Sequence, residues 1–208
     1  MISKAGSRTY ERAHFPSRHP RLSTMERCLL KWAVIDRDDR VLDVGLGNGL
    51  MAEYLLRNME CEVCGVADDM ELVRSNRGLV RSADLVYAAA GDIPWRDQAF
   101  HTVLLRPCRL DESAMENQLR EVHRVLKEGG QLVMALENLP APLRSTLDAI
   151  RETPAEATEN ITRRRAMKML SQLGFEQFSW HPCGIFAGAL VAWKRNTVEE
   201  RFKKGEGE

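Results

Sequence analysis

Three glycines, separated by single residues, follow an apolar run that contains a carboxylate. The run 41–44 reads V-L-D-V and leads into Gly45, Gly47 and Gly49. Glycines at a strand-to-helix turn let a ligand approach the backbone and expose N–H groups at the start of a helix. Dinucleotide-binding loops prefer the spacing G-x-G-x-x-G, which would require glycine at position 50, where this chain has leucine. Because Asp43 stands two residues before the first glycine, the loop favours a ligand that carries an ammonium group over a pyrophosphate.

Short β-rich runs alternate with helical runs around this loop. Strands are expected over Arg40–Val44, Glu62–Val66, Asp84–Ala88, Phe100–Leu105 and Gln131–Leu136, and helices over Leu50–Met59, Met70–Arg77 and a stretch that ends at Gly129-Gly130. Strands that alternate with helices imply parallel pairing through right-handed crossovers. The sequence therefore predicts an α/β fold with a Rossmann-like, doubly wound sheet.

The C-terminal third predicts a helix followed by two reversed strands. Thr162 is the expected N-cap of the helix, and Gly174 ends it. The strands Phe175–Trp180 and Ile185–Trp193 are joined by a link too short for a parallel crossover, so they must form an antiparallel hairpin. We expect one domain with a seven-stranded sheet, mostly parallel with a reversed C-terminal hairpin. Its parts are an N-terminal cap (1–36), a cofactor-binding core (37–136), a cap insert (137–160), the C-terminal helix and hairpin (161–194) and a charged tail (195–208).

Composition narrows the class of partner. The 208 residues include 30 Lys plus Arg and 30 Asp plus Glu, and this zero formal balance removes the usual electrostatic argument for a nucleic-acid ligand. No apolar run approaches the ~18 residues of a membrane-spanning helix, and the polar, basic start does not resemble a secretory signal. We therefore expect a protein that acts away from membranes, with nucleic acid disfavoured as a partner. The sequence leaves the oligomeric state open.

The five cysteines favour a reducing, cytoplasmic location, because an odd count suits a disulfide scaffold poorly. Cys61-x-x-Cys64 has no second pair that could complete a zinc site, so we expect no metal. The pair falls in the expected strand around 62–66, where residues three apart point to opposite faces. The sequence therefore predicts that Cys61 and Cys64 are buried structural thiols.

The glycine loop and three further segments, in the same order, resemble the class I S-adenosylmethionine-dependent methyltransferases, especially small-molecule enzymes of the quinone-biosynthesis type. The loop matches the first motif of that family, V-L-D-V-G-x-G-x-G. The segment 91–95, G-D-I-P-W, with a following phenylalanine resembles a shortened G-D-x-x-x-L-P-F motif, and 119–130 resembles the signature E-x-x-R-V-L-K-P-G-G. The reversed terminal hairpin is also a hallmark of the family. The resemblance runs from about Tyr10 to Lys194.

The resemblance implies S-adenosyl-L-methionine as the cofactor, bound at the carboxyl ends of the strands. The loop residues Gly45, Leu46, Gly47 and Gly49 would contact its methionine part. Asp43 would help to hold its amino group.

The same resemblance implies which residues contact the adenine of the cofactor. Asp92 would lie beside the adenine and Ile93 would pack on the ring, while Arg106, just after the fourth strand, would face the pocket floor. The alternative for Asp92 is a turn or helix-cap residue.

One departure from the family falls at the second strand, where an acid usually grips the ribose hydroxyls. Ala67 occupies that place here, with Asp68 and Asp69 just beyond it. Asp68 comes 19 positions after Gly49, close to the ~20 expected of a ribose-binding acid. The alternative is that Asp68 or Asp69 caps the following helix.

Methyl transfer from a sulfonium depends chiefly on alignment, and a general base is needed only when the acceptor arrives protonated. Candidate bases are Tyr10, His14 and His19, in an N-terminal segment that resembles the substrate-covering cap of the family. The alternative is that these residues belong to a solvated basic arm.

The resemblance implies methyl transfer to a small-molecule acceptor. The alternative is a cofactor-binding, catalytically altered relative with a regulatory role, motivated by Ala67, by the unusual segment Arg106-Pro107-Cys108, and by His101, where the family usually has aspartate. We expect His101 to be structural.

Overall fold

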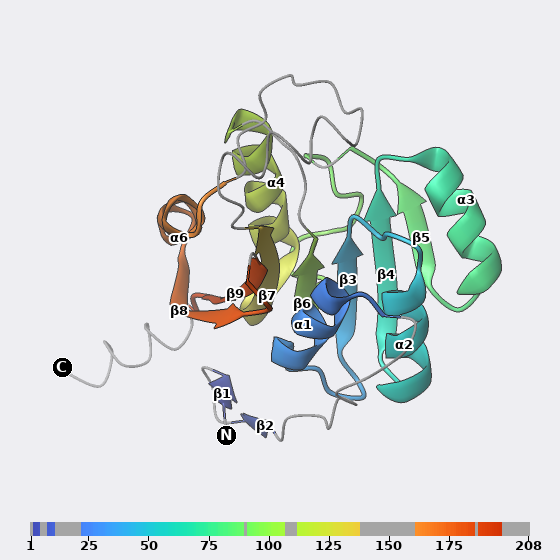
Figure 1. Cartoon of the computed structure of the whole chain (residues 1–208), viewed down its shortest axis with the longest axis horizontal. Helices are drawn as coiled ribbons and strands as arrows, with labels where there is room; N and C mark the ends of the chain where they lie inside the picture. Colours follow the sequence, from blue (N-terminus) through green and yellow to red (C-terminus); the bar gives the residue numbers. More distant parts are fainter. Residues whose placement is uncertain are drawn as a thin grey trace.

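The computed structural model describes residues 2–4, 8–10, 22–89, 91–106, 112–137, 161–185 and 187–196 (Figure 1). The expected base candidates His14 and His19, the segment Pro107-Cys108, nearly all of the cap insert and most of the charged tail lie outside these residues.

One seven-stranded sheet forms the centre of the molecule, in the order β5-β4-β3-β6-β7-β9-β8. The strands β3 to β7 pair in parallel, whereas β9 is antiparallel to both β7 and β8. This arrangement confirms the predicted doubly wound sheet with a reversed C-terminal hairpin. The bounds are β3 Arg40–Val44, β4 Glu62–Ala67, β5 Asp84–Tyr87, β6 Phe100–Leu105, β7 Leu126–Glu137, β8 Phe175–Pro182 and β9 Ala187–Lys194.

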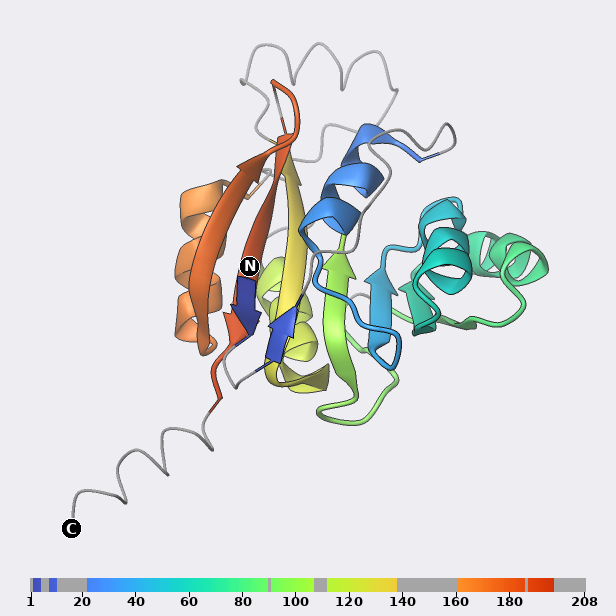
Figure 2. The same cartoon turned by 90° about the horizontal axis from the view of Figure 1, so that it is seen from below.

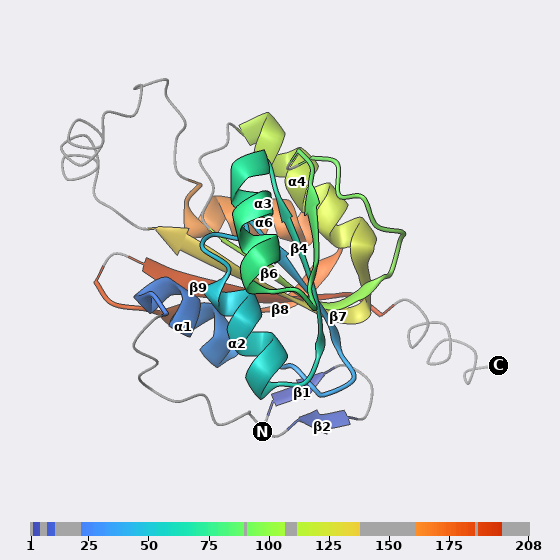
Figure 3. The ribbon, with the colours of Figure 1, turned by 90° about the vertical axis from the view of Figure 1, so that its right-hand side faces the viewer.

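Helices cover both faces of the sheet (Figures 2 and 3). The apolar core on one face includes Leu29, Leu55 and Val73, and the core on the other face includes Leu119 and Leu170. The first three residues belong to α1, α2 and α3, and the last two to α4 and α6. The helix bounds are α1 Thr24–Trp32, α2 Leu50–Asn58, α3 Met70–Leu79, α4 Glu112–Val125 and α6 Arg163–Gln172.

Three elements near the N-terminus were not predicted. A short antiparallel ribbon pairs β1 (Ile2–Lys4) with β2 (Arg8–Tyr10). Helix α1 begins at a capping box, in which Glu26 N donates to Ser23 Oγ over 3.2 Å and Ser23 N donates to the Glu26 carboxylate over 2.7 Å. The S-x-x-E spacing that produces this reciprocal cap is present in the sequence.

The boundary between α4 and β7 differs from the prediction. The helix ends at Val125, and Gly129 and Gly130 lie inside β7 instead of ending the helix. Gly129 has a φ of +68°, and a Cβ on Gly130 would lie 2.7 Å from the Lys127 carbonyl oxygen. The two glycines therefore permit a tight irregular entry into the strand, because side chains there would clash or strain the backbone.

The cysteines divide into a bonded pair and buried thiols. Cys28 of α1 and Cys183, which follows β8, form a disulfide with a Cα–Cα distance of 6.0 Å, a bond that the odd cysteine count did not predict. Cys61 and Cys64 are free and buried, and they belong to the cores on opposite faces of the sheet. Their burial confirms the prediction of buried thiols, and it raises the pKa of each to about 11, which disfavours the reactive thiolate.

His101 lies at the start of β6, at the opposite end of the strand from Arg106. Its Nδ1 accepts a hydrogen bond from Arg40 N over 2.8 Å, and its Nε2 lies 2.6 Å from Lys127 Nζ. These contacts join three strands and confirm the structural role expected of His101. No helix among the described residues is long and apolar enough to cross a membrane.

Candidate cofactor site

The glycine loop connects the carboxyl end of β3 to α2, as predicted. Gly45, Gly47 and Gly49 have φ values of +90°, +53° and +75°, a region in which non-glycine residues are strained. Gly45 N donates a 2.9 Å hydrogen bond to the Val66 carbonyl oxygen, which ties the loop to β4. The repeated glycines are therefore needed for the path of the backbone itself.

An ion-paired triad lies beneath this loop. Arg106 follows β6, the strand next to β3, and its Nε and Nη2 donate to the two carboxylate oxygens of Asp43, each over 3.3 Å. Its Nη1 donates to Glu26 Oε1 over 2.9 Å. The side chain of Asp43 is fully buried, that of Glu26 is 3% exposed, and that of Arg106 is 15% exposed. Two buried carboxylates therefore share one guanidinium.

The pKa directions follow from this geometry. Burial raises the pKa of Asp43, and the nearby Arg106 opposes that rise. Burial also acts to raise the pKa of Glu26, but the hydrogen bonds from Ser23 and Arg106 outweigh it and leave the pKa below its ordinary value. Although burial disfavours the charged guanidinium, the two carboxylates raise the pKa of Arg106 further above its already high value. Arg106 is therefore a permanent cation in the triad.

Arg106 also packs against the glycines. A Cβ built on Gly47 would lie 2.8 Å from Arg106 Nη1, and one on Gly45 would lie 3.4 Å from Arg106 Cβ. The carboxylate oxygens of Asp43 and Glu26 can accept hydrogen bonds from an ammonium group, so these residues fit the amino group at the amino-acid end of S-adenosylmethionine. In the described conformation the Arg106 guanidinium holds both carboxylates. Arg106, which was expected to face the floor of the pocket, therefore lies where the amino group of the cofactor was predicted to bind.

Helix α3 holds the loop from its outer side through Asn76. The side-chain amide of this buried residue donates to the Gly47 carbonyl oxygen over 2.9 Å. A Cβ on Gly49 would lie 2.5 Å from Asn76 Oδ1, so the third glycine makes room for this side chain. Sequence reasoning did not identify Asn76, because the contact joins residues 29 positions apart.

The ligand contact expected of Leu46 stays a prediction, and its side chain has a structural role. Its side chain is fully buried, and a Cβ on Gly65 would lie 2.5 Å from Leu46 Cδ1. The leucine therefore points under the loop into the core between β3 and β4. Only its backbone is placed to serve a ligand.

The end of β4 bears on the ribose assignment. Ala67 is buried at the last position of the strand, and Asp68 is exposed just beyond it. Asp69 is the N-cap of α3, with its carboxylate accepting from Glu71 N over 2.9 Å and Leu72 N over 3.1 Å. Capping thus occupies Asp69 and leaves Asp68 as the acid available for a ribose.

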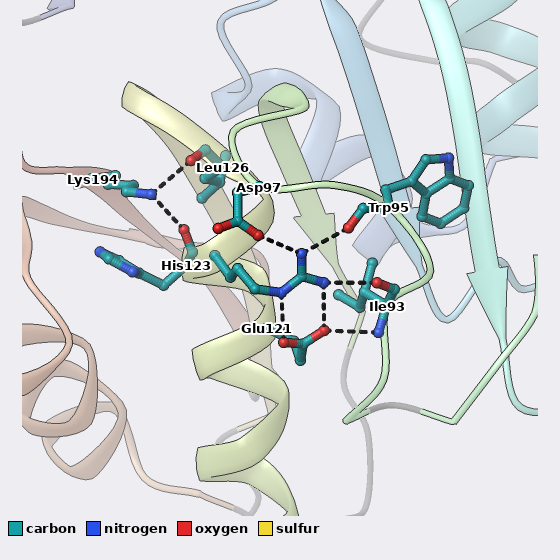
Figure 4. A network of polar contacts seen from close by, with 8 residues as sticks. Ile93, Trp95, Asp97, Glu121, His123, Leu126 and Lys194 are labelled. Carbon is teal, nitrogen blue, oxygen red and sulfur yellow. Dashed lines mark hydrogen bonds and ion pairs between the residues drawn. The ribbon is translucent and has the colours of Figure 1, made fainter.

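The expected adenine segment is attached to α4 by Arg124 and Glu121 (Figure 4). Arg124 donates to the carbonyl oxygens of Ile93 and Trp95 over 2.8 and 2.7 Å, and to Asp97 over 2.8 Å. Glu121 accepts from Ile93 N over 3.0 Å and is paired with Arg124. These residues are the E-x-x-R of the helical signature, so this motif positions the segment after β5.

Asp92 is exposed in this segment, whereas Ile93 is 1% exposed and belongs to the core with Phe100. The adenine contacts expected of Asp92 and Ile93 stay predictions, and in this conformation the Ile93 side chain packs in the core. Tyr10 is described only through its backbone in β2. Among the described residues, no group of three or more His, Cys, Asp or Glu side chains is placed to hold a metal ion.

The fold and the site define a class of protein. A parallel sheet with a reversed hairpin carries a glycine loop and a buried carboxylate at the carboxyl ends of its strands, which is where open α/β sheets bind nucleoside cofactors. Residues 42–134 match the model of a methyltransferase domain.

Comparisons with known proteins agree. The chain is 29% identical over 168 residues to a sarcosine/dimethylglycine N-methyltransferase of Halorhodospira halochloris, covering 76% of this chain and 58% of that protein. It is 32% identical over 114 residues to the ubiquinone/menaquinone biosynthesis C-methyltransferase UbiE of Xanthomonas oryzae pv. oryzae, covering 51% of this chain and 45% of that one. The chain thus spans about half the length of these curated relatives. The crystal structure of the [4+2]-cyclase SpnF has the same fold, with a TM-score of 0.66, 20% identity and coverage of 82% of this chain and 80% of SpnF.

Over the matched residues, the chain is thus similar to S-adenosylmethionine-dependent methyltransferases of class I.

Proposed function

We propose that this protein transfers a methyl group from S-adenosylmethionine to a small-molecule acceptor. The observation that carries the proposal is the carboxylate pair, Asp43 and Glu26, buried under a glycine loop at the carboxyl end of the sheet. A buried carboxylate pair of this kind suits the ammonium group of an amino-acid end, and the two curated relatives are named as methyltransferases of small molecules.

Bound cofactor would supply an electrophilic methyl group on a sulfonium, and the protein would align the acceptor with it. Asp43 and the backbone of 45–49 would hold the methionine part. Asp68 would bind the ribose, and Asp92 would lie near the adenine. The acceptor would enter from the N-terminal cap, where Tyr10, His14 and His19 are the candidate bases. We place this reaction in the cytoplasm and assign it no nucleic-acid partner.

The test is transfer of label from methyl-labelled S-adenosylmethionine to a panel of phenols, carboxylic acids and amines, with sarcosine among the amines. We expect label in at least one acceptor class, with equimolar S-adenosylhomocysteine. Gly47→Val is the matched control, because a side chain at position 47 would collide with the Arg106 guanidinium beside the loop. Label transfer that is equal in wild type and Gly47→Val would contradict the proposed site.

A second candidate is a cofactor-binding relative without methyl transfer. The observation that favours it is the Arg106 guanidinium bound to Asp43. SpnF, named as a [4+2]-cyclase, has the same fold, so the fold alone does not specify methyl transfer. Binding of S-adenosylhomocysteine without label transfer across the whole panel would favour this candidate.

A further inference from the structure

The seat expected for the cofactor's amino group contains a cation from the protein itself. Both carboxylate oxygens of Asp43 accept from Arg106, and Glu26 accepts from the same guanidinium. An ammonium and a guanidinium are both cationic groups that only donate hydrogen bonds, so they compete for the same oxygens. Asp43 is fully buried and therefore has no other solvent-facing side to offer a second cation.

Arg106 also competes for space. Its Nη1 and Cζ atoms would lie 2.8 and 2.9 Å from a Cβ on Gly47, so the guanidinium rests directly against the loop backbone. A methionine chain lying over Gly47 would have to enter this volume. The Arg106 guanidinium and the methionine part of the cofactor therefore compete both for the carboxylate oxygens and for the same volume.

Resting on the proposed function, we propose that Arg106 is an exchangeable occupant of the cofactor seat, which the ammonium group of the incoming ligand replaces. Of the three triad side chains, Arg106 is the most exposed, at 15%, and it is the one that can turn towards solvent. Its departure alone would leave two buried carboxylates uncompensated, which is strongly unfavourable. The exchange therefore needs a ligand that brings its own cation, and Arg106 selects for an intact amino-acid end.

The test compares two ligands on wild type and Arg106→Ala by calorimetric titration. S-adenosylhomocysteine carries the ammonium, whereas 5′-methylthioadenosine has the same nucleoside and thioether without the amino-acid end. We expect Arg106→Ala to bind S-adenosylhomocysteine at least about tenfold more tightly than wild type, since no internal cation has to leave. Its affinity for 5′-methylthioadenosine should change much less. Arg120→Ala, an exposed arginine of α4, is the matched control and should change neither affinity.

Arg106→Lys guards against loss of folding in the alanine variant, since it retains a cation beside Asp43 but cannot bridge both carboxylates. We expect an intermediate gain in affinity for S-adenosylhomocysteine. Circular dichroism and a thermal melt establish that each variant is folded.

Three results would overturn the inference in distinguishable ways. Weaker binding of S-adenosylhomocysteine by both Arg106 variants would make the guanidinium a direct ligand of the cofactor. Unchanged binding by folded variants would show that Arg106 does not compete. Absence of binding by wild type and both variants would overturn the proposed function together with the inference.

Discussion

The side-chain amide of Asn76 donates a 2.9 Å hydrogen bond to the backbone carbonyl oxygen of Gly47, and so α3 fixes the middle of the glycine loop. Asn76 is 3% exposed, which means that water cannot readily replace it. The shape of the loop therefore depends on a residue of the following α/β unit as well as on its own glycines.

Replacing Asn76 should loosen the loop. Asn76→Ala removes a buried hydrogen bond and leaves the Gly47 carbonyl oxygen without this donor, which typically costs about 1–3 kcal/mol in the free energy of unfolding. Chemical denaturation measures this loss, and titration with S-adenosylhomocysteine should show weaker binding. The neighbouring exposed Ser75 provides the control, and Ser75→Ala should change both quantities little. Equal effects of the two substitutions would refute the role of Asn76.

Arg124 should control the position of the segment 93–97. Arg124→Lys keeps the charge but cannot donate to Ile93, Trp95 and Asp97 together. Each charged hydrogen bond is worth about 1.5–3 kcal/mol. If one of those that Arg124 donates is needed to hold the segment in its ligand-binding position, its loss would weaken S-adenosylhomocysteine binding about tenfold. Titration measures the affinity, and Arg120→Lys on the same helix is the control. If both variants bound S-adenosylhomocysteine as tightly as wild type, the hydrogen bonds of Arg124 would have no role in ligand binding.

His123 makes stability depend on pH in a defined window. Burial, and secondarily the charge of Lys194, lowers its pKa from 6.5 to about 4 in the folded protein. Between pH 6.5 and about 4, His123 is therefore protonated in the unfolded chain and neutral in the folded protein. The free energy of unfolding should fall as pH drops from 6.5 towards 4, by at most about 1.4 kcal/mol per unit and less because the side chain is partly exposed.

The variant His123→Gln removes this titrating group. Its free energy of unfolding should fall less steeply than that of wild type over the same interval, and parallel denaturation curves from pH 4 to 7 measure the difference. Identical slopes would mean that His123 titrates normally. Lys194 Nζ donates to the carbonyl oxygens of His123 and Leu126 over 2.7 and 2.8 Å (Figure 4), so its cation lies close to the ring.

The disulfide between Cys28 and Cys183 should be detectable by alkylation. In purified, air-oxidised protein under denaturing conditions, Cys28 and Cys183 should react only after reduction, whereas Cys61 and Cys64 should react without it. The bond closes a loop across a sequence separation of 155 residues, and loop-entropy estimates for such lengths give about 4–5 kcal/mol. Reduction should therefore lower the melting temperature of wild type but not that of Cys28→Ala/Cys183→Ala.

The same alkylation in freshly lysed cells tests the cytoplasmic assignment, which came from the odd cysteine count. Complete alkylation of Cys28 and Cys183 without reductant is expected in a reducing compartment. Protection of both would place the protein in an oxidising one.

Local patterns made the core of the fold predictable. The alternation of strands and helices predicted the parallel sheet, and the short link after β8 predicted the reversed hairpin. The boundary of α4 was wrong because Gly129 and Gly130 were interpreted as a helix end, whereas they permit an irregular strand entry. Helix α1 was missed although its S-x-x-E cap is present in the sequence.

The contacts within the site were predictable only where the residues are neighbours along the chain. The loop and Asp43 lie within seven positions, and their pattern is visible in the sequence. Arg106 contacts Asp43 and Glu26 across separations of 63 and 80 residues, and no local spacing reveals such contacts. The buried positions of Leu46 and Ile93 likewise depend on the packing of distant strands and helices.

The most direct measurement of the central claim is a pair of calorimetric titrations of the wild-type chain, one with S-adenosylhomocysteine and one with NAD. The account predicts that S-adenosylhomocysteine binds, with a dissociation constant on the order of micromolar, that NAD gives no binding heat, and that Gly47→Val loses the first interaction. Binding of NAD without binding of S-adenosylhomocysteine would contradict it.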